Sequence, residues 1–253
     1  LYCDGEQRDQ RYGEGDRDVY ADLAIARDSV MKKAVFALLA CCFAAHAGVT
    51  VDGTRFIFDA DKPSITFTVN NTAQQRYLVL SKVLNAQGQA GNDVPFMTTP
   101  PLFPLLPGHS NIVRIMRIGG DLPADRESLF WLSVASIPET QGKQPPNSLQ
   151  VAIRSRMKLF YRPAGLKGRE EEAYRQLVWK KQGRQIQINN PTPYYITLFN
   201  LRVNGSTVDN AGMVAPFATA AKSECPASGA CVVQWQTIND YGRVMPELTQ
   251  TLR

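Results

Sequence analysis

The chain has 253 residues, of which 44% are hydrophobic and 20% are charged, and its formal net charge is +5. Its two histidines, His46 and His109, lack the partner residues that a histidine-based catalytic triad or a metal cluster would need. The sequence contains neither a G-x-S-x-G nucleophile elbow nor a Walker phosphate-binding motif, so we expect no enzyme activity.

Residues 1–30 differ in composition from the rest of the chain. They contain eight acidic residues, four arginines and little apolar periodicity, and they begin with Leu where a start codon would give Met. We interpret residues 1–30 as upstream sequence translated from a wrong start. The alternative is a disordered extension. In either case we exclude this segment from the folded part of the protein.

Residues 31–47 have the pattern of a secretory signal peptide. A basic start, Met31-Lys32-Lys33, precedes the apolar residues 34–45, and Ala45-His46-Ala47 fits the small-x-small cleavage site. The apolar stretch is too short to span a bilayer. We therefore expect cleavage after Ala47, export to the periplasm and no stable membrane insertion. A lipoprotein signal is the alternative, because Leu38–Cys41 loosely resembles a lipidation box.

Removal of the front of the chain changes the charge and the cysteine content. Residues 1–30 and the two signal lysines hold 6 of the 28 basic and 8 of the 23 acidic residues, which leaves 22 and 15, a net charge of about +7. This charge suits an anionic partner or a carboxylate-binding site. Cys225 and Cys231 remain, in CPASGAC, and two close cysteines in an exported chain predict a local disulfide.

Short segments with alternating apolar and polar residues fill the exported part and predict an all-β fold. The predicted strands lie at 54–59, 64–71, 76–85, 111–118, 128–138, 177–181, 185–190, 194–204, 212–217 and 231–239. The charged stretch 164–176 lacks this alternation and is interpreted as a connector. We therefore expect two β-sandwich domains, at 48–165 and 166–253.

The segment NSLQVAIRSRMKLFYRP, residues 147–163, alternates over an unusual length. Leu149, Val151, Ile153, Met157 and Leu159 share one parity, and arginines and a lysine occupy the other. The apolar stripe would span roughly 36 Å as a strand, whereas a common strand has about 5–6 residues. On the residues alone, the stripe is either the core face of a sandwich strand or a surface that binds a partner.

Five motifs together resemble the PapD-like periplasmic chaperones of chaperone–usher pilus assembly. The motifs are TPPLFPLLPGHSNIVRI (99–115), LPADRESLFWLSVASIPE (122–139), MKLFYRP (157–163), NPTPYYITL (190–198) and INDYG (238–242). The sequence departs from the usual signature at Ser133, where Asn is common, and at Glu139, where Pro or a small residue is common. The resemblance implies two immunoglobulin-like β-sandwich domains at an angle, with a cleft between them.

The same resemblance implies a function and its partners. Such a chaperone binds pilus subunits, including the adhesin, by donor-strand complementation, and delivers them to an outer-membrane usher. It needs no metal or nucleotide cofactor, and it does not bind nucleic acid. Leu149, Val151 and Ile153 would be the donor side chains. Met157 and Leu159, which are nearer the sandwich, are expected to belong to the core.

By resemblance, Arg55 and Lys158 would bind the C-terminal carboxylate of the subunit. Two fixed cations on one carboxylate make charge-assisted hydrogen bonds, which are stronger than neutral ones. The charged residues Glu127, Arg162 and Asp240 match a cluster that links the two domains in this family.

Thr99 and Pro100 resemble a family turn with a cis proline, a form that X–Pro bonds adopt at modest cost. A structural fimbrial subunit or adhesin-like β-sandwich protein is the alternative function. Such a subunit would need its own donor segment after the signal peptide, and GVTVDGTRF (48–56) is too short for one.

Overall fold

The structure is a computed structural model that describes residues 48–91, 93–140, 149–222 and 225–253. The predicted signal peptide and the segment before it lie outside the described residues. In the described part of the chain, no helix has the length and apolar character needed to cross a membrane.

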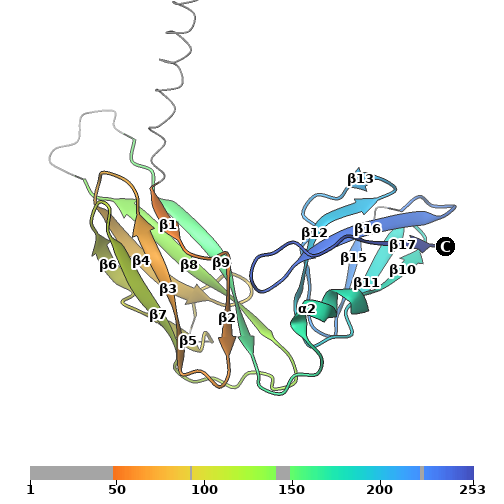
Figure 1. Ribbon diagram of the computed structural model, residues 1–253, viewed down its shortest axis with the longest axis horizontal. Helices are drawn as coiled ribbons and strands as arrows, with labels where there is room; N and C mark the ends of the chain where they lie inside the picture. The colour runs from red at the N-terminus through yellow and green to blue at the C-terminus, as the bar shows by residue number, and fades with distance from the viewer. Residues whose placement is uncertain (1–47, 92, 141–148, 223–224) are drawn as a thin grey trace, which may run out of the picture. The chain divides into compact units, whose positions relative to one another are not determined.

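The N-terminal half of the described chain forms two β-sheets that share one core (Figure 1). The sheets have the strand orders β1-β3-β7-β5 and β2-β9-β8-β4-β6. The strands are β1 (Val49–Val51), β2 (Arg55–Asp59), β3 (Ser64–Asn71), β4 (Tyr77–Leu84), β5 (Phe96–Thr99), β6 (Leu102–Leu105), β7 (Ser110–Arg117), β8 (Ser128–Pro138) and β9 (Ile153–Arg162). All pairs are antiparallel except β2–β9, which is parallel.

Alternation along each strand builds this core, because successive side chains point to opposite faces of a sheet. On β4, for example, Val79 is fully buried whereas Leu78 is exposed. Aromatic rings fill the space between the sheets: the Phe96 and Phe130 rings meet edge to face with centroids 5.0 Å apart. Such edge-to-face pairs are favourable beyond their buried area.

The chain changes sheets at Thr99-Pro100-Pro101. β5 pairs with β7 in one sheet, and β6 pairs with β4 in the other. The Thr99–Pro100 peptide bond at this point is cis. This turn therefore carries the chain from β5 in one sheet to β6 in the other.

The C-terminal half forms a second sandwich, with sheets of strand order β10-β11-β15 and β13-β12-β16-β17 (Figure 1). An additional strand, β14, pairs with β12. The strands are β10 (Val178–Gln182), β11 (Gln185–Asn189), β12 (Ile196–Val203), β13 (Ser206–Thr207), β14 (Met213–Val214), β15 (Thr219–Lys222), β16 (Cys231–Ile238) and β17 (Leu248–Leu252). In its core, the Trp179 and Trp235 rings have centroids 4.6 Å apart.

The predicted connector contains one short helical segment, α2 (Glu170–Ala173), followed by a 3₁₀ turn at Tyr174–Gln176. Ala173 and Tyr174 are buried in the core of the second sandwich. Part of the connector therefore belongs to the second sandwich, which its run of charged residues did not predict.

Several short strands were not predicted from the alternation of residues. β5 and β6 flank two prolines, and β13, β15 and β17 are two to five residues long. The predicted strand 212–217 is real only at Met213–Val214. Segments this short show too few alternations to be distinguished from loops.

Candidate functional site

Strand β9 changes environment along its length. Met157 and Leu159 are buried, at 7% and 0% exposure, whereas Ile153, at its start, is 57% exposed. Val151 and Leu149, which precede the strand, are 60% and 89% exposed. The apolar stripe therefore belongs to the core at one end and to the surface at the other, as expected for Met157 and Leu159.

The exposed end of β9 also has an open backbone edge. β8 pairs with β9 from Ile153 to Tyr161, but β2 covers the other edge only from Lys158 to Arg162. Within the described chain, residues 153–157 therefore have a strand on one side only. An edge of this kind presents unpaired N–H and C=O groups that can pair with another chain.

Two cations lie where the open edge ends. Arg55, at the start of β2, and Lys158, on β9, are direct neighbours in the parallel pair. The Arg55 Nη1 donates to the carbonyl oxygen of Ile238 at 2.7 Å, and the Lys158 Nζ donates to the Thr197 Oγ1 at 3.3 Å. Among the described residues, no carboxylate forms an ion pair with either cation. The Arg55 Nε is buried and lacks a partner in the same part of the chain.

Partial burial makes this pair of charges unfavourable in the unbound protein. Desolvation lowers the pKa of Arg55. Desolvation, together with the repulsion from Arg55, lowers the pKa of Lys158 to about 8. Burial disfavours the charged form of a cation, and a like charge adds to the effect. A carboxylate placed between the two groups would stabilise the charged form of each.

The predicted charge cluster is assembled around Arg162. Its Nη2 lies 2.6 Å from the Glu127 Oε1, and its Nη1 lies 2.7 Å from the Asp240 Oδ2. Glu127 is 3% exposed and also accepts a hydrogen bond from the Tyr195 N–H at 2.7 Å. The cluster thus joins Glu127, just before β8, and Arg162, at the end of β9, to residues of the second sandwich.

Burial and charge act against each other in this cluster. Desolvation raises the pKa of Glu127, and Arg162 only partly offsets it. For Arg162, desolvation is outweighed by Asp240 and Glu127, which together raise its pKa. Glu170, on α2, was not predicted: burial, followed by repulsion from Asp240, raises its pKa to about 7. Its position in a run of three glutamates hid it among residues that are usually solvated.

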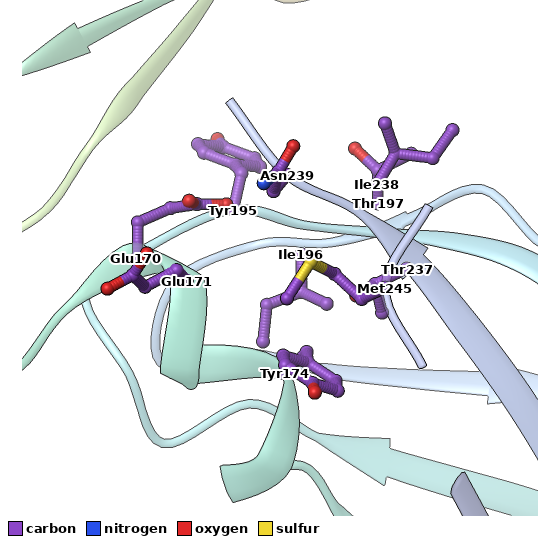
Figure 2. A pocket seen from close by; sticks show the side chains of 10 residues that line it. All are labelled: Glu170, Glu171, Tyr174, Tyr195, Ile196, Thr197, Thr237, Ile238, Asn239 and Met245. Carbon is purple, nitrogen blue, oxygen red and sulfur yellow. The ribbon is translucent and has the colours of Figure 1, made fainter. Parts of the chain in front are cut away.

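The second sandwich has a small pocket whose lining includes the hydrogen-bond acceptors of Arg55 and Lys158 (Figure 2). It is lined by α2 with its following turn, by Tyr195 and the start of β12, and by the end of β16 with Asn239 and Met245. Thr197 and Ile238, which bind Lys158 and Arg55, both belong to this lining. Its volume of about 10 Å³ barely admits one water molecule, so it is no site for a small organic ligand.

The remaining predicted features occur as follows. Cys225 and Cys231 form a disulfide with their Cα atoms 5.7 Å apart, and both are buried. Among the described residues, no group of three or more His, Cys, Asp or Glu side chains is placed to hold a metal ion.

The outer face of the five-stranded sheet carries an apolar patch that the alternation of residues did not single out. Leu78 on β4 lies in register with Pro104 on β6 and with Ile137 on β8, and Leu102 lies one row away beside Leu80. Leu102 is 51% exposed, Leu78 39% and Ile137 37%. Large contiguous apolar patches on a protein surface are typical of sites of protein interaction.

Comparisons with known proteins agree with this arrangement. Residues 48–167 match the family model for the PapD N-terminal domain of pili and flagellar-assembly chaperones, and residues 172–249 match the PapD C-terminal domain. The chain is 43% identical over 226 residues to the "Uncharacterized fimbrial chaperone YcbF" of Escherichia coli K12, a match that covers 86% of this chain and 95% of that protein. It is 38% identical over 208 residues to the "Chaperone protein FimC" of the same strain, with coverage of 81% and 85%.

Solved structures give the same result. The Salmonella enterica SafB chaperone, solved in complex with the SafA pilin, matches with a TM-score of 0.74 and 31% identity, over 81% of this chain and 96% of that one. The E. coli chaperone DraB matches with a TM-score of 0.70 and 34% identity, over 81% and 97%. This chain belongs to the PapD family of pili-assembly chaperones.

Proposed function

We propose that this protein is a periplasmic chaperone that captures pilus subunits by donor-strand complementation. The single observation that carries the proposal is the start of β9, where exposed apolar side chains occur on an open strand edge. Leu149, Val151 and Ile153 would fill apolar pockets of a subunit, and the free backbone edge would pair with its strands. The solved complex of a related chaperone with a pilin supports this choice of partner.

The anchor of this interaction is the pair Arg55 and Lys158. The two cations have lost part of their hydration and have no ion-pair partner in the described chain. A subunit's C-terminal carboxylate would supply the missing charge through charge-assisted hydrogen bonds. Because one end of the bound strand is then fixed, the anchor would also set its register along β9.

The proposal includes delivery to an outer-membrane usher and excludes catalysis. The apolar patch at Leu78, Leu102, Pro104 and Ile137 offers a second surface on the outer face of the sheet, opposite the face that carries the apolar stripe of β9. A chaperone needs two such surfaces, since it must hold a subunit while the usher is engaged. Donor-strand pairing forms no covalent bond and requires no cofactor.

Three variants test the capture of subunits. The subunit is first identified by pull-down of the purified chaperone from the periplasm with mass spectrometry, and its affinity is then measured. Lys158→Ala should weaken capture by roughly 1.5–3 kcal/mol, the scale for hydrogen bonds to charged groups. Arg55→Ala should act in the same way. Ile153→Asp should abolish capture, because it would bury a charge in the subunit's groove.

Thermal unfolding of the same variants separates binding from folding. Ile153 is 57% exposed, so Ile153→Asp should leave the melting temperature of the free chaperone nearly unchanged. If binding and folding failed together in all three variants, the donor-strand proposal would be wrong. Normal capture by both Lys158→Ala and Arg55→Ala would remove the carboxylate anchor alone.

Export is tested separately. We propose that the chain is cleaved after Ala47 and divides into domains at 48–165 and 166–253. Intact-mass analysis of periplasmic protein should give an N-terminus at Gly48. Retention of residues 1–30 in the mature protein would contradict both the start-site interpretation and the predicted signal.

A further inference from the structure

The face of β9 opposite the apolar stripe carries its own pattern. Arg154 and Arg156 are both exposed, and they alternate with Ile153, Ser155 and Met157. Successive side chains of a strand point to opposite faces, so the two arginines share the outer face of the sheet with Lys158. The proposed donor function uses the apolar face and Lys158, and it leaves Arg154 and Arg156 without a role.

These two arginines have no anionic neighbours in the sheet. Across β8, Arg154 faces Ala135 and Arg156 faces Ser133. The next residue in the row of Arg156 is Lys82 on β4, a third cation. Among the described residues, no carboxylate forms an ion pair with either arginine. The outer face beside the open edge is therefore a run of like charges that an anionic partner would neutralise.

The anchor fixes how a bound strand would pass these arginines. If its C-terminal carboxylate is held at Lys158 and Arg55, its preceding residues lie along the open edge from 157 back to 153. The bound strand then runs in the same direction as β9, on the side that β2 covers farther along. Neighbouring strands lie about 4.7–4.9 Å apart, so side chains on the same face of adjacent strands come into contact. Two outer-face residues of the guest, two positions apart, would thus face Arg156 and Arg154.

We propose that Arg154 and Arg156 recognise acidic side chains on the guest strand, so that this chaperone selects subunits with two carboxylates spaced two residues apart near the C-terminus. The inference rests on the proposed function, because it uses the carboxylate anchor to set the register. It adds a charge criterion to a pairing that the backbone alone would make with many sequences. Opposite charges across neighbouring strands are favourable, and like charges are unfavourable.

Synthetic peptides test the charge criterion directly. Each peptide alternates Val with one variable residue, ends in a free carboxylate, and carries Glu, Gln or Lys at the two variable positions nearest its C-terminus. Calorimetry with the purified chaperone at low salt should rank Glu above Gln and Gln above Lys. The Glu peptide should bind roughly twofold to thirtyfold more tightly than the Gln peptide, for two cross-strand pairs.

The advantage of the Glu peptide should depend on the two arginines and on ionic strength. It should disappear in Arg154→Gln/Arg156→Gln and shrink at about 1 M salt, where charges are screened beyond about 3 Å. Arg114→Gln is the matched control, because Arg114 is an exposed arginine on β7 in the other sheet. The control should retain the full Glu preference.

Equal affinity for the Glu and Gln peptides, or binding of neither, would overturn the inference, as would loss of the preference in Arg114→Gln. Amidated versions of the peptides separate this result from the proposed function. If amidation left every affinity unchanged, the carboxylate anchor would be wrong, whereas the Glu–Gln difference would still report on Arg154 and Arg156.

Discussion

At the scale of single residues, the site is defined by charges that are costly in the free protein. Arg55 and Lys158 are neighbours of like sign, both partly desolvated, and their hydrogen-bond acceptors are a carbonyl and a hydroxyl oxygen. Neutral acceptors compensate a cation less well than a carboxylate does. If the pair binds a carboxylate, as we propose, this binding should be sensitive to pH.

The pKa of Lys158 predicts how capture responds to alkaline pH. Below its pKa of about 8 the free protein already carries the charge that a carboxylate needs. Above pH 8 the amine is neutral and must take up a proton on binding, so affinity should fall, approaching about tenfold per pH unit. Calorimetric titration of a carboxylate-terminated peptide between pH 6 and pH 10 measures the fall.

Lys158→Arg provides the control for this pH dependence. Arginine stays protonated over the whole range, so its affinity should be nearly flat up to pH 10. An identical decline in the variant and in the wild-type protein would assign the titration to another group.

The buried carboxyl group of Glu170 predicts that the stability of the folded protein also depends on pH. Its pKa rises from 4.5 to about 7 in the folded protein, chiefly through burial. The folded state therefore holds a proton that the unfolded chain has lost, and this contribution to stability disappears as the pH rises from about 4.5 through 7. Glu170→Gln should make urea-unfolding midpoints less dependent on pH in that window. A variant that followed the wild-type curve throughout would contradict the assignment.

At the scale of elements, β9 joins two roles in one strand. Met157, Leu159 and Tyr161 belong to the core of the sandwich, whereas Ile153, at the start of the strand, is exposed. The rigid half positions the exposed half, because both lie on one continuous backbone paired with β8. A partner that adds a strand at the open edge thus meets a template that is already extended.

This division predicts that truncations along one stripe have unequal effects. Leu159→Ala removes a fully buried side chain and should destabilise the protein by about 2–5 kcal/mol. Val151→Ala, at 60% exposure, should change stability by less than about 0.5 kcal/mol while weakening subunit capture. Urea unfolding of both variants checks the contrast. Equal losses of stability would mean that the exposed half packs against something in the free protein.

The sequence predicts an element well where the pattern lies within one segment, and poorly where the feature depends on the pairing of distant segments. Alternation alone located β3, β4, β8 and β16. Met157 and Leu159 were correctly expected in the core because they lie nearer the sandwich, although they share their parity with the exposed Ile153. The neighbourhood of Arg55 and Lys158 depends on the parallel β2–β9 pair, which joins distant segments and leaves no trace in either. Only the resemblance to a family brought these residues together, and it could not indicate Glu170 or the bond from Tyr195.

The disulfide is an element-scale constraint within the second sandwich. Cys225 and Cys231 enclose a short loop, and both are buried. By the loop-entropy relation, replacing both cysteines with alanine should lower the free energy of unfolding by about 2 kcal/mol. Urea unfolding of the double variant measures this loss. Alkylation of the denatured, unreduced wild-type protein should leave both thiols unlabelled, and labelling of both would show that the bridge does not form.

At the scale of the whole molecule, Arg162 connects the two halves of the described chain. Its guanidinium holds Glu127 of the first sandwich and Asp240 of the second, and Glu127 also accepts the Tyr195 N–H. Buried ion pairs are weak evidence for stability, because desolvation offsets much of the attraction. Removal of one partner is different, since it leaves the other charge buried and uncompensated.

Arg162→Gln should therefore destabilise the protein strongly. The variant would leave the carboxylate of Glu127, which is 3% exposed, without its guanidinium partner, and the cost of such a loss is about 3–5 kcal/mol. The double variant Glu127→Gln/Arg162→Gln should recover part of this loss, because an amide carries no buried charge and can still accept the Tyr195 N–H. Asp240→Asn should cost less than Arg162→Gln, because the Asp240 side chain is 18% exposed.

Urea unfolding followed by the fluorescence of Trp131 in the first sandwich and of Trp179 and Trp235 in the second measures all three variants. If the double variant were no more stable than Arg162→Gln, the penalty would not come from a stranded Glu127 charge, and the cluster would act through packing instead.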